Sequence, residues 1–434
     1  MKKWSFFYEV VRFFVRLIHD WFYRRIIIHG KKHIPQNKAV VFAPNHQNAL
    51  MDPLAIIFTN KLQTVFLTRS DVFKKFLVPV FSFLKMLPVY RIRDGAESLK
   101  NNEIIFEKSV EILESGMSMA LFPEALHFGK RSLRPLKKAI PRIVFQAEEK
   151  NLFNTDIQIV PTGIYYDNYT DSNSLLQVNY GRPIAVKKFK AEYERNPQRA
   201  MLQLRDAISE GIKPLIIHIE DLENYDLYEN LRHLLRKRMA RKSKILRPNQ
   251  NWFKIDKRTI ERIENLPAAQ FETLKGLHID FMKAFKETGL YSLEIRKSNW
   301  LKFILNSLLL IVGFPIFLFA LIHSGIPYFL LKHYLKTKIK DPQFHSSLKF
   351  GFGLFVLPIF YLLISFIPFF ILDGHYFTYF LLLVVTGLTT VKYKLLFRNT
   401  RMHWGTIRAR LFKQRKYRKM IRLYLEIANL IGLK

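Results

Sequence analysis

The chain has 434 residues and a formal net charge of +34, with 69 Lys and Arg against 35 Asp and Glu. It is also 49% hydrophobic and 15% aromatic, whereas soluble nucleic-acid-binding proteins are basic but seldom so apolar. The chain contains no cysteine, which excludes thiol nucleophiles, cysteine metal ligands and disulfides. Basic charge combined with long apolar runs favours the anionic cytoplasmic face of a membrane.

Residues 1–23 are predicted to form an amphipathic helix that lies on a membrane surface. The apolar face comprises Phe6, Phe7, Val10, Val11, Phe14, Leu17, Ile18, Trp21 and Phe22. The opposite face carries Glu9, Arg12, Arg16 and Asp20, which interrupt the apolar core that a signal peptide would need. The alternative is an ordinary helix whose apolar face packs on the protein core.

Residues 24–220 alternate between short β-branched runs and helical stretches, a pattern that predicts an α/β domain with a mostly buried central sheet flanked by helices. The expected strands cover 25–30, 38–44, 64–68, 118–123, 157–166 and 175–181. The expected helices lie near 53–60, 71–84, 97–115 and 138–149, with a closing helical segment at 186–216.

The remainder of the chain is predicted to be helical and partly embedded in a membrane. Residues 221–299 form a charged helical segment to which the sequence assigns no role. Residues 300–391 hold three apolar runs and are expected to form transmembrane hairpins, the first run bending at Pro315 and Pro327 to enter and return. Three plain spans are the alternative. Residues 392–434 are then a basic cytoplasmic tail.

The stretch VFAPNHQNALMDPL at 41–54 carries the chemistry that we expect. We predict a strand that ends near Pro44 and a helix that begins with Asp52 as its N-cap and Pro53 as its first residue. A loop between them brings His46 near Asp52, so that the carboxylate orients the imidazole and the second ring nitrogen accepts a proton from a hydroxyl. A surface histidine beside a capping aspartate is the alternative.

Four blocks in fixed order resemble the glycerolipid acyltransferase family, which includes the glycerol-3-phosphate and 1-acylglycerol-3-phosphate acyltransferases. They are NHQNALMDPL, LPVYRIRD, LFPEALHFGKRSLRPLKKA and IVPTGIYYD, and the resemblance covers about residues 24–185. Two departures stand out. Five residues separate His46 from Asp52 where the family usually has four, and Ala125 replaces a family glycine.

The resemblance implies roles for individual residues. His46 is the expected general base and Asp52 orients it. The expected substrate-binding residues are Asn45, Arg91, Arg93, Glu124 and Lys137. Among them Arg91 would hold the phosphate of the acceptor and Glu124 its glycerol, while Arg93 and Lys137 are further cations near the phosphate. His127 has no second ligand at metal spacing, so we expect no metal and no cofactor.

The function that follows is a membrane-bound O-acyltransferase of phospholipid biosynthesis. The donor would be acyl-CoA or acyl-carrier protein, and the acceptor glycerol-3-phosphate or 1-acylglycerol-3-phosphate. We expect an integral protein of the cell membrane, in contact with anionic lipid, whose catalytic domain faces the cytoplasm. The alternatives are another lyso-lipid acceptor, or a non-catalytic membrane protein that binds anionic lipid or nucleic acid through its basic tail, although we expect no nucleic-acid partner.

Overall fold

The computed structural model describes residues 4–73, 76, 78–90, 96–126, 128–246, 248–293, 299–372 and 375–433. The chain divides into two compact units. The first comprises Met1–Glu220 together with Asp341–Phe350, and the second comprises Asp221–Lys340 together with Gly351–Lys434. Asp341–Phe350 thus belong to the first unit, although they lie within the region 300–391 that we predicted to be transmembrane.

The first unit is built on one mixed sheet of eight strands, which confirms the predicted α/β class. Its strands are β1 (Arg25–His29), β2 (Val40–Pro44), β3 (Val65–Arg69), β4 (Met86–Val89), β5 (Met119–Ala120), β6 (Gln158–Tyr166), β7 (Leu175–Tyr180) and β8 (Ile184–Ala185). The order is β1-β7-β6-β2-β5-β3-β4, with β8 on β6. β2 is parallel to both β5 and β6, and β6 is antiparallel to β7. The two strands that we did not predict, β4 and β8, are among the shortest.

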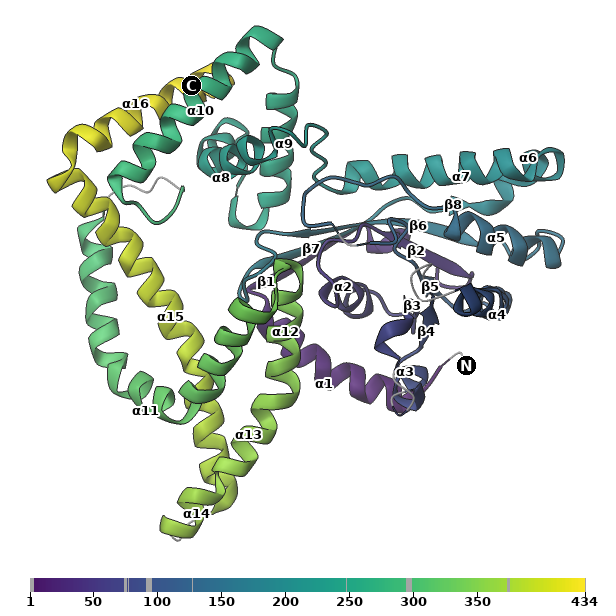
Figure 1. The fold of residues 1–434 in the computed structure, drawn as a ribbon, viewed down its shortest axis with the longest axis horizontal. Coiled ribbons are helices and arrows are strands. Elements are labelled where there is room, and N and C mark those ends of the chain that lie inside the picture. Colours follow the sequence, from purple (N-terminus) through teal and green to yellow (C-terminus); the bar gives the residue numbers. More distant parts are fainter. Residues whose placement is uncertain are drawn as a thin grey trace. The chain divides into compact units, whose positions relative to one another are not determined.

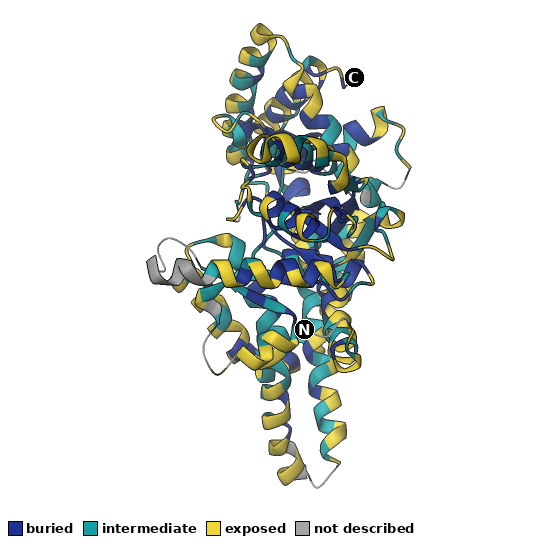
Figure 2. Cartoon of the chain, turned by 90° about the vertical axis from the view of Figure 1, so that its right-hand side faces the viewer, coloured by how far each residue is buried: buried dark blue, intermediate teal, exposed yellow. Residues whose placement is uncertain are grey.

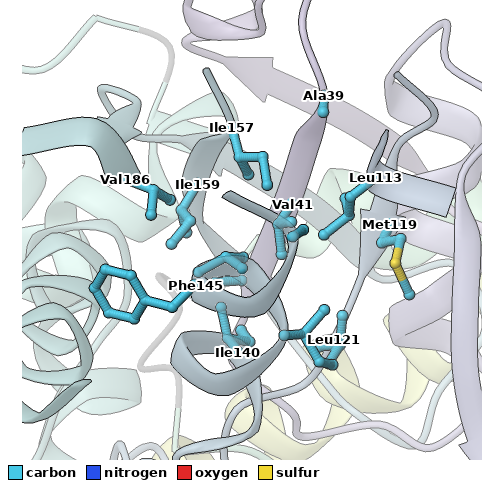
Figure 3. Packing of buried hydrophobic residues seen from close by; sticks show 14 of the residues in the cluster. Ala39, Val41, Leu113, Met119, Leu121, Ile140, Phe145, Ile157, Ile159 and Val186 are labelled. Carbon is cyan, nitrogen blue, oxygen red and sulfur yellow. The ribbon is translucent and has the colours of Figure 1, made fainter. Parts of the chain in front are cut away.

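Helices cover both faces of this sheet (Figure 1). They are α1 (Phe6–Phe22), α2 (Met51–Thr59), α3 (Val78–Phe83), α4 (Ala96–Glu114), α5 (Ala139–Lys150), α6 (Lys190–Arg195) and α7 (Pro197–Ile212), with a 3-10 turn at Ser70–Val72. Helices α4, α5 and α7 pack on one face, where Val41 and Ile159 meet Phe145 and Ile140 (Figure 3). Helix α2 lies on the other face, where Thr59 hydrogen-bonds the Tyr180 hydroxyl at 2.6 Å.

The sequence of α7 explains why it forms and where it packs. Asn196 caps the helix by accepting a hydrogen bond from the Arg199 N–H, and Pro197 occupies the first turn, where a missing N–H costs nothing. Ala200, Leu204, Ile208 and Ile212 then recur every four residues and are all buried. This apolar stripe is the face that closes the core over the sheet.

Helix α1 packs against the rest of the first unit through a mostly polar face. Arg12 donates to the backbone oxygens of Ile57 and Asn60, and His19 is fully buried. The aromatic face points outward, and Phe7 is 73% exposed. The arrangement is the reverse of a helix that turns its apolar face to a core. It leaves a row of Phe, Val and Trp side chains to meet another apolar phase.

The second unit is helical throughout its described residues. Its helices are α8 (Tyr225–Lys242), α9 (Trp252–Glu264), α10 (Ala268–Thr288), α11 (Trp300–Lys338), α13 (Leu357–Ile364), α14 (Phe366–Leu372), α15 (Tyr376–Phe412) and α16 (Gln414–Leu430), with a π-helical turn at Phe352–Val356. By length and composition, three helical stretches are able to cross a membrane: Trp300–Lys338, Pro342–Ile371 and Tyr376–Phe412. Figure 2 shows exposed residues along the apolar helices, as expected of surfaces that face lipid.

The basic C-terminal region is part of the helical unit. Helix α15 continues past Val391 to Phe412, and α16 then packs along α10. Arg238 donates to the backbone oxygen of Leu433 at 2.9 Å, and Lys413 donates to that of Glu287 at 2.9 Å. The segment 221–299, to which the sequence assigned no role, therefore packs against the C-terminal region.

Helix α11 is a single helix of 39 residues that bends back on itself, as Figure 1 shows. The Phe317 ring stacks on Tyr393 with a centroid distance of 4.2 Å, and the Tyr328 ring lies 3.2 Å from the Lys394 ammonium. A straight helix would carry Tyr328 about 16 Å beyond Phe317 along α15. Both instead meet the same turn of α15, because Pro315 and Pro327 lie inside α11 and each removes a backbone hydrogen bond.

Candidate active site

The candidate site lies where three neighbouring strands end. Pro44, the last residue of β2, pairs with Thr162 of β6, and β5 lies in parallel register on the other side of β2. The loop after β2 begins at Asn45 and the loop after β5 holds Glu124. Carboxyl ends of neighbouring parallel strands share one edge of a sheet, which is where open α/β folds place ligands.

His46 and Asp52 face each other across the loop that joins β2 to α2. The Nδ1 atom of His46 lies 2.8 Å from Oδ2 of Asp52. The carboxylate is buried, whereas the imidazole side chain is 16% exposed. Phe122 stacks on the imidazole with ring centroids 4.1 Å apart, which fixes the plane of the ring. The structure thus brings the two residues together, as the sequence predicts.

The Asp52 carboxylate organises the whole loop. Its Oδ2 atom also accepts the backbone N–H groups of Gln47 and Asn48, each at 2.7 Å, while Oδ1 accepts the Tyr166 hydroxyl at 2.8 Å. A carboxylate with four donors is held in one orientation. Burial and the adjacent Asp52 charge raise the pKa of Tyr166 well above its ordinary value, so Tyr166 remains a donor.

The prediction that Asp52 is the N-cap of α2 is wrong. The N-cap is Leu50, the helix begins at Met51, and Asp52 lies inside the first turn. The carboxylate turns back to the loop because His46 and two loop N–H groups offer it charge-assisted hydrogen bonds. As a cap it would bind only the N–H groups in the first turn of its own helix. Pro53 accordingly is the third residue of the helix.

Asn45 has a positioning role in this structure. Its side chain is buried, the amide nitrogen donates to the backbone oxygen of Ile164 at 3.1 Å, and the amide oxygen accepts the Ile164 N–H at 2.7 Å. The substrate contact that we predicted for Asn45 stays a prediction. The two hydrogen bonds fasten the residue before His46 to β6, which is a rigid central strand.

Glu124, after β5, supports the loop of residues 45–50 between β2 and α2, which we name the catalytic loop after its proposed role. Its carboxylate accepts the backbone N–H of His46 at 2.8 Å and that of Arg134 at 3.1 Å. The side chain is buried, and burial raises the pKa of Glu124 to about 7 despite these two donors. The backbone follows a turn here with no helix, so Glu124 is not a helix cap. Its position links the third sequence block to the first.

The next residue, Ala125, has a φ of 64°. This left-handed conformation is disfavoured for a residue with a Cβ atom and is readily adopted by glycine. The position is the one at which the resembling family has glycine, so the geometry explains that preference. This chain retains the turn, with the Ala125 N–H donating to the Phe122 oxygen at 3.1 Å, although the residue has changed.

Of the three cations that we predicted to bind phosphate, Lys137 lies among the described residues. Lys137 is exposed, and its backbone N–H donates to the oxygen of Pro123 at 2.8 Å, which keeps it beside the Glu124 turn. Arg91, Arg93 and His127 lie outside the described residues. Arg131, which we did not single out, is buried and donates to the Tyr166 oxygen at 2.8 Å, so it supports β6. Among the described residues, no group of three or more His, Asp or Glu side chains is arranged to hold a metal ion.

Sequence reasoning missed the residues that support the pair. Tyr166 lies in the fourth block that we quoted, and Phe122 lies in the third, but neither block suggested a role for them. Tyr169 donates to the Gln47 side-chain oxygen at 2.8 Å and so links the loop after β6 to the catalytic loop. An aromatic residue at the carboxyl end of a strand next to β2 was the available signal.

A family model described as Acyltransferase matches residues 25–165. Glycerol-3-phosphate O-acyltransferase 1 of Saccharomyces cerevisiae is 25% identical over 133 residues, which are 30% of this chain and 17% of the yeast protein. The crystal structure of the 1-acyl-sn-glycerophosphate (LPA) acyltransferase of Thermotoga maritima has 18% identity and a TM-score of 0.36, covering 48% of this chain and 77% of that one. Residues 25–165 of this chain therefore match an acyltransferase domain, and the chain spans only a small part of the yeast relative's length.

Proposed function

We propose that this protein is a membrane-bound O-acyltransferase that moves a fatty acyl group from acyl-CoA or acyl-carrier protein to a hydroxyl of glycerol-3-phosphate or 1-acylglycerol-3-phosphate. The observation that carries the proposal is the 2.8 Å contact between His46 and Asp52 at the end of β2, within a matched acyltransferase domain. The pair needs no protein nucleophile, because the acceptor supplies the attacking hydroxyl.

The reaction begins with proton transfer. Asp52 holds Nδ1 of His46, so Nε2 takes the proton of the acceptor hydroxyl while the oxygen attacks the thioester carbonyl carbon. The resulting tetrahedral intermediate carries negative charge on the former carbonyl oxygen. Asp52 supports the imidazolium that forms, and its four donors keep the carboxylate from rotating.

Collapse of the intermediate completes the transfer. The carbon–sulfur bond breaks, the new ester remains on the acceptor, and the leaving thiolate takes the proton from the imidazolium. His46 is then neutral again, and no oxidant, reductant or metal has been consumed. The stacking of Phe122 on the imidazole keeps Nε2 at one place through both proton transfers.

A phosphorylated acceptor is supported by the charge of the loop after β5. Residues 130–138 contain five basic side chains and no acidic one. Lys137 is exposed near the Glu124 turn, and Arg91 and Arg93 belong to the second block. Basic side chains bind phosphate oxygens, and arginine matches their geometry through a planar fork. We assign the phosphate to Arg91, with Arg93 and Lys137 as auxiliary cations.

The proposed location is the cell membrane, with the catalytic domain on the cytoplasmic side where thioester donors occur. The support is the three apolar helices, the exposed aromatic face of α1, and the net charge of +34, which favours an anionic leaflet.

The test is acyl transfer by the purified full-length protein, read by mass spectrometry. Labelled acyl-CoA and acyl-carrier protein are the donors. The acceptors are glycerol-3-phosphate, 1-acylglycerol-3-phosphate, a lyso-aminolipid and unphosphorylated monoacylglycerol. We expect transfer to a phosphorylated acceptor, with turnover reduced at least 100-fold by His46→Ala. The exposed His29, changed to Ala, is the matched control and should leave turnover intact. Comparable turnover of a folded His46→Ala protein would remove the proposed base.

A further inference from the structure

The segment Asp341–Phe350 lies far from the catalytic loop in sequence but within the same compact unit. It joins α11 to the next apolar helices and consists of a 3-10 turn, Pro342–Phe344, and the start of the short helix α12, His345–Gly351. The acyltransferase match ends at residue 165, so this segment is outside the matched domain. We name it the connector.

The connector is hydrogen-bonded directly to the catalytic loop. Ser346 donates from Oγ to the side-chain oxygen of Asn48 at 2.5 Å, and the Leu50 N–H donates to Oγ of Ser347 at 3.1 Å. Both serines are buried. Between their partners lies Ala49, whose φ of 34° is a conformation that a residue with a Cβ atom rarely adopts. The two serines therefore hold the loop on either side of its least favourable backbone position.

Further contacts fix the connector in place. Lys349 donates from Nζ to the backbone oxygen of Thr170 at 2.7 Å, in the loop that follows β6. The same loop also contacts Asn48, because the Asn48 amide nitrogen donates to the backbone oxygen of Tyr169 at 3.1 Å. The Phe350 side chain is buried and meets the Phe22 ring at a centroid distance of 5.8 Å.

A short chain of bonds leads from the connector to the catalytic pair. Asn48 accepts from Ser346 through its side chain and donates to Asp52 through its backbone N–H at 2.7 Å. Asp52 in turn holds Nδ1 of His46 at 2.8 Å. Displacement of Asn48 would remove one donor from the carboxylate that orients the imidazole, without touching any atom that reacts.

We propose that the connector is a positioning element of the active site, with Ser346 and Ser347 holding the catalytic loop in the geometry that sets His46 against Asp52. The inference deepens the proposed function and rests on it. Because the connector is continuous with α11 and with the helices that follow α12, the membrane region supplies part of the catalytic unit. Ser346 and Ser347 are positioning residues, since they act through Asn48 and Leu50.

The kinetic test compares Ser346→Ala, Ser347→Ala and the double variant with wild type. We expect the double variant to lose at least tenfold in kcat, with KM for both substrates within about twofold, because a misplaced base slows the chemical step and leaves binding intact. Ser347→Thr, which keeps the hydroxyl, should retain most activity. Ser109→Ala is the matched control, since Ser109 is also buried and its hydroxyl bonds within α4, to the Ile105 oxygen.

A double-mutant cycle tests the specific contact. If Ser346 acts through Asn48, Ser346→Ala should have little further effect on kcat in an Asn48→Ala background. Additive losses would overturn the proposed path. A kcat within twofold of wild type in the folded double variant, or a loss confined to KM, would overturn the positioning role itself.

A measurement independent of turnover separates this proposal from the proposed function. Hydrogen–deuterium exchange of the peptide covering residues 46–52 should accelerate at least tenfold in the double serine variant and stay unchanged in Ser109→Ala. Unchanged exchange in both variants would overturn the connector proposal. Wild-type protein that transfers no acyl group to any acceptor, while the exchange result holds, would instead contradict the proposed function alone.

Discussion

The Tyr166 hydroxyl donates to Oδ1 of Asp52 at 2.8 Å, on the carboxylate oxygen opposite the one that holds His46. The two oxygens thus have separate tasks. One orients the imidazole and the other anchors the carboxylate to β6, the long central strand. A carboxylate that is held at both oxygens cannot rotate away from His46 during the proton transfers that we propose.

Tyr166→Phe should therefore lower kcat at least tenfold while leaving KM nearly unchanged, since one hydrogen bond to a charged group is worth about 1.5–3 kcal/mol. Asp52→Asn should lower kcat further because it also weakens the support of the imidazolium. Tyr165→Phe is the matched control, because the neighbouring side chain on a strand points to the opposite face. Steady-state kinetics of the three variants decide the matter, and equal losses for Tyr165→Phe and Tyr166→Phe would contradict the assigned contact.

Glu124 should give the protein a measurable pH dependence of stability. Its pKa is raised from 4.5 to about 7 by burial, so the folded chain holds this proton between those pH values while the unfolded chain has lost it. The free energy of unfolding contributed by Glu124 must then fall as the pH rises from about 4.5 to 7, by at most ~3 kcal/mol.

The Glu124→Gln variant cannot titrate at this position, which isolates the effect. We expect the melting temperature of wild type, relative to the variant, to decline as the pH rises across that window. All other titrating groups are common to both proteins and cancel in the difference. A constant or widening difference between pH 4.5 and 7 would show that Glu124 is ionised throughout.

Arg91 is the residue that we assign to the phosphate of the acceptor. Arg91→Ala should raise KM for the phosphorylated acceptor at least tenfold and leave KM for the acyl donor nearly unchanged, because only the acceptor loses a charge-assisted bidentate contact. Lys137→Ala should have a smaller effect of the same kind. The measurement is a two-substrate kinetic analysis. Equal changes for donor and acceptor would move the phosphate contact to Arg93 or Lys137.

The strongest sequence signals were local ones. The β-branched run before Asn45 predicts β2, and the histidine, loop and aspartate that follow predict the contact between His46 and Asp52. The apolar runs after residue 300 likewise predict the long helices, because the length of an apolar run can be counted directly along the sequence. In these cases neighbours in sequence are also the partners in space.

The rest of the site depends on partners that local patterns cannot identify. Tyr166 meets Asp52 across 114 residues, and Ser346 meets Asn48 across 298. The N-cap assigned to Asp52 was wrong for the same reason, since preferences for helix ends describe an isolated helix and ignore the loop that competes for the carboxylate. The sequence blocks identified where function lies but not the contacts that support it.

The helical unit constrains how the chain crosses a membrane. Helix α10, which precedes the membrane region, packs along α16, which follows it, so both flanks lie on one side and the number of crossings is even. The connector belongs to the catalytic unit, so the far end of α11 lies on the side of the membrane that we propose for that unit, the cytoplasmic side. The bend of α11, where His323 meets Thr386 with a 3.0 Å contact between Nε2 and Oγ1, accounts for this return. We infer that α11 enters and returns, and that α13, α14 and α15 form the one complete hairpin.

Single-cysteine labelling tests this topology, and the native chain simplifies the experiment because it contains no cysteine. Lys338, His375 and Arg415 are all exposed in the structure and are suitable for substitution. With a membrane-impermeant maleimide on intact cells, we expect labelling of His375→Cys and protection of Lys338→Cys and Arg415→Cys, while permeabilised cells should label all three. Three plain spans would place Lys338 on the far side from the start of α11. Labelling of Lys338→Cys in intact cells would therefore contradict the re-entrant α11, because that helix would then cross the membrane completely.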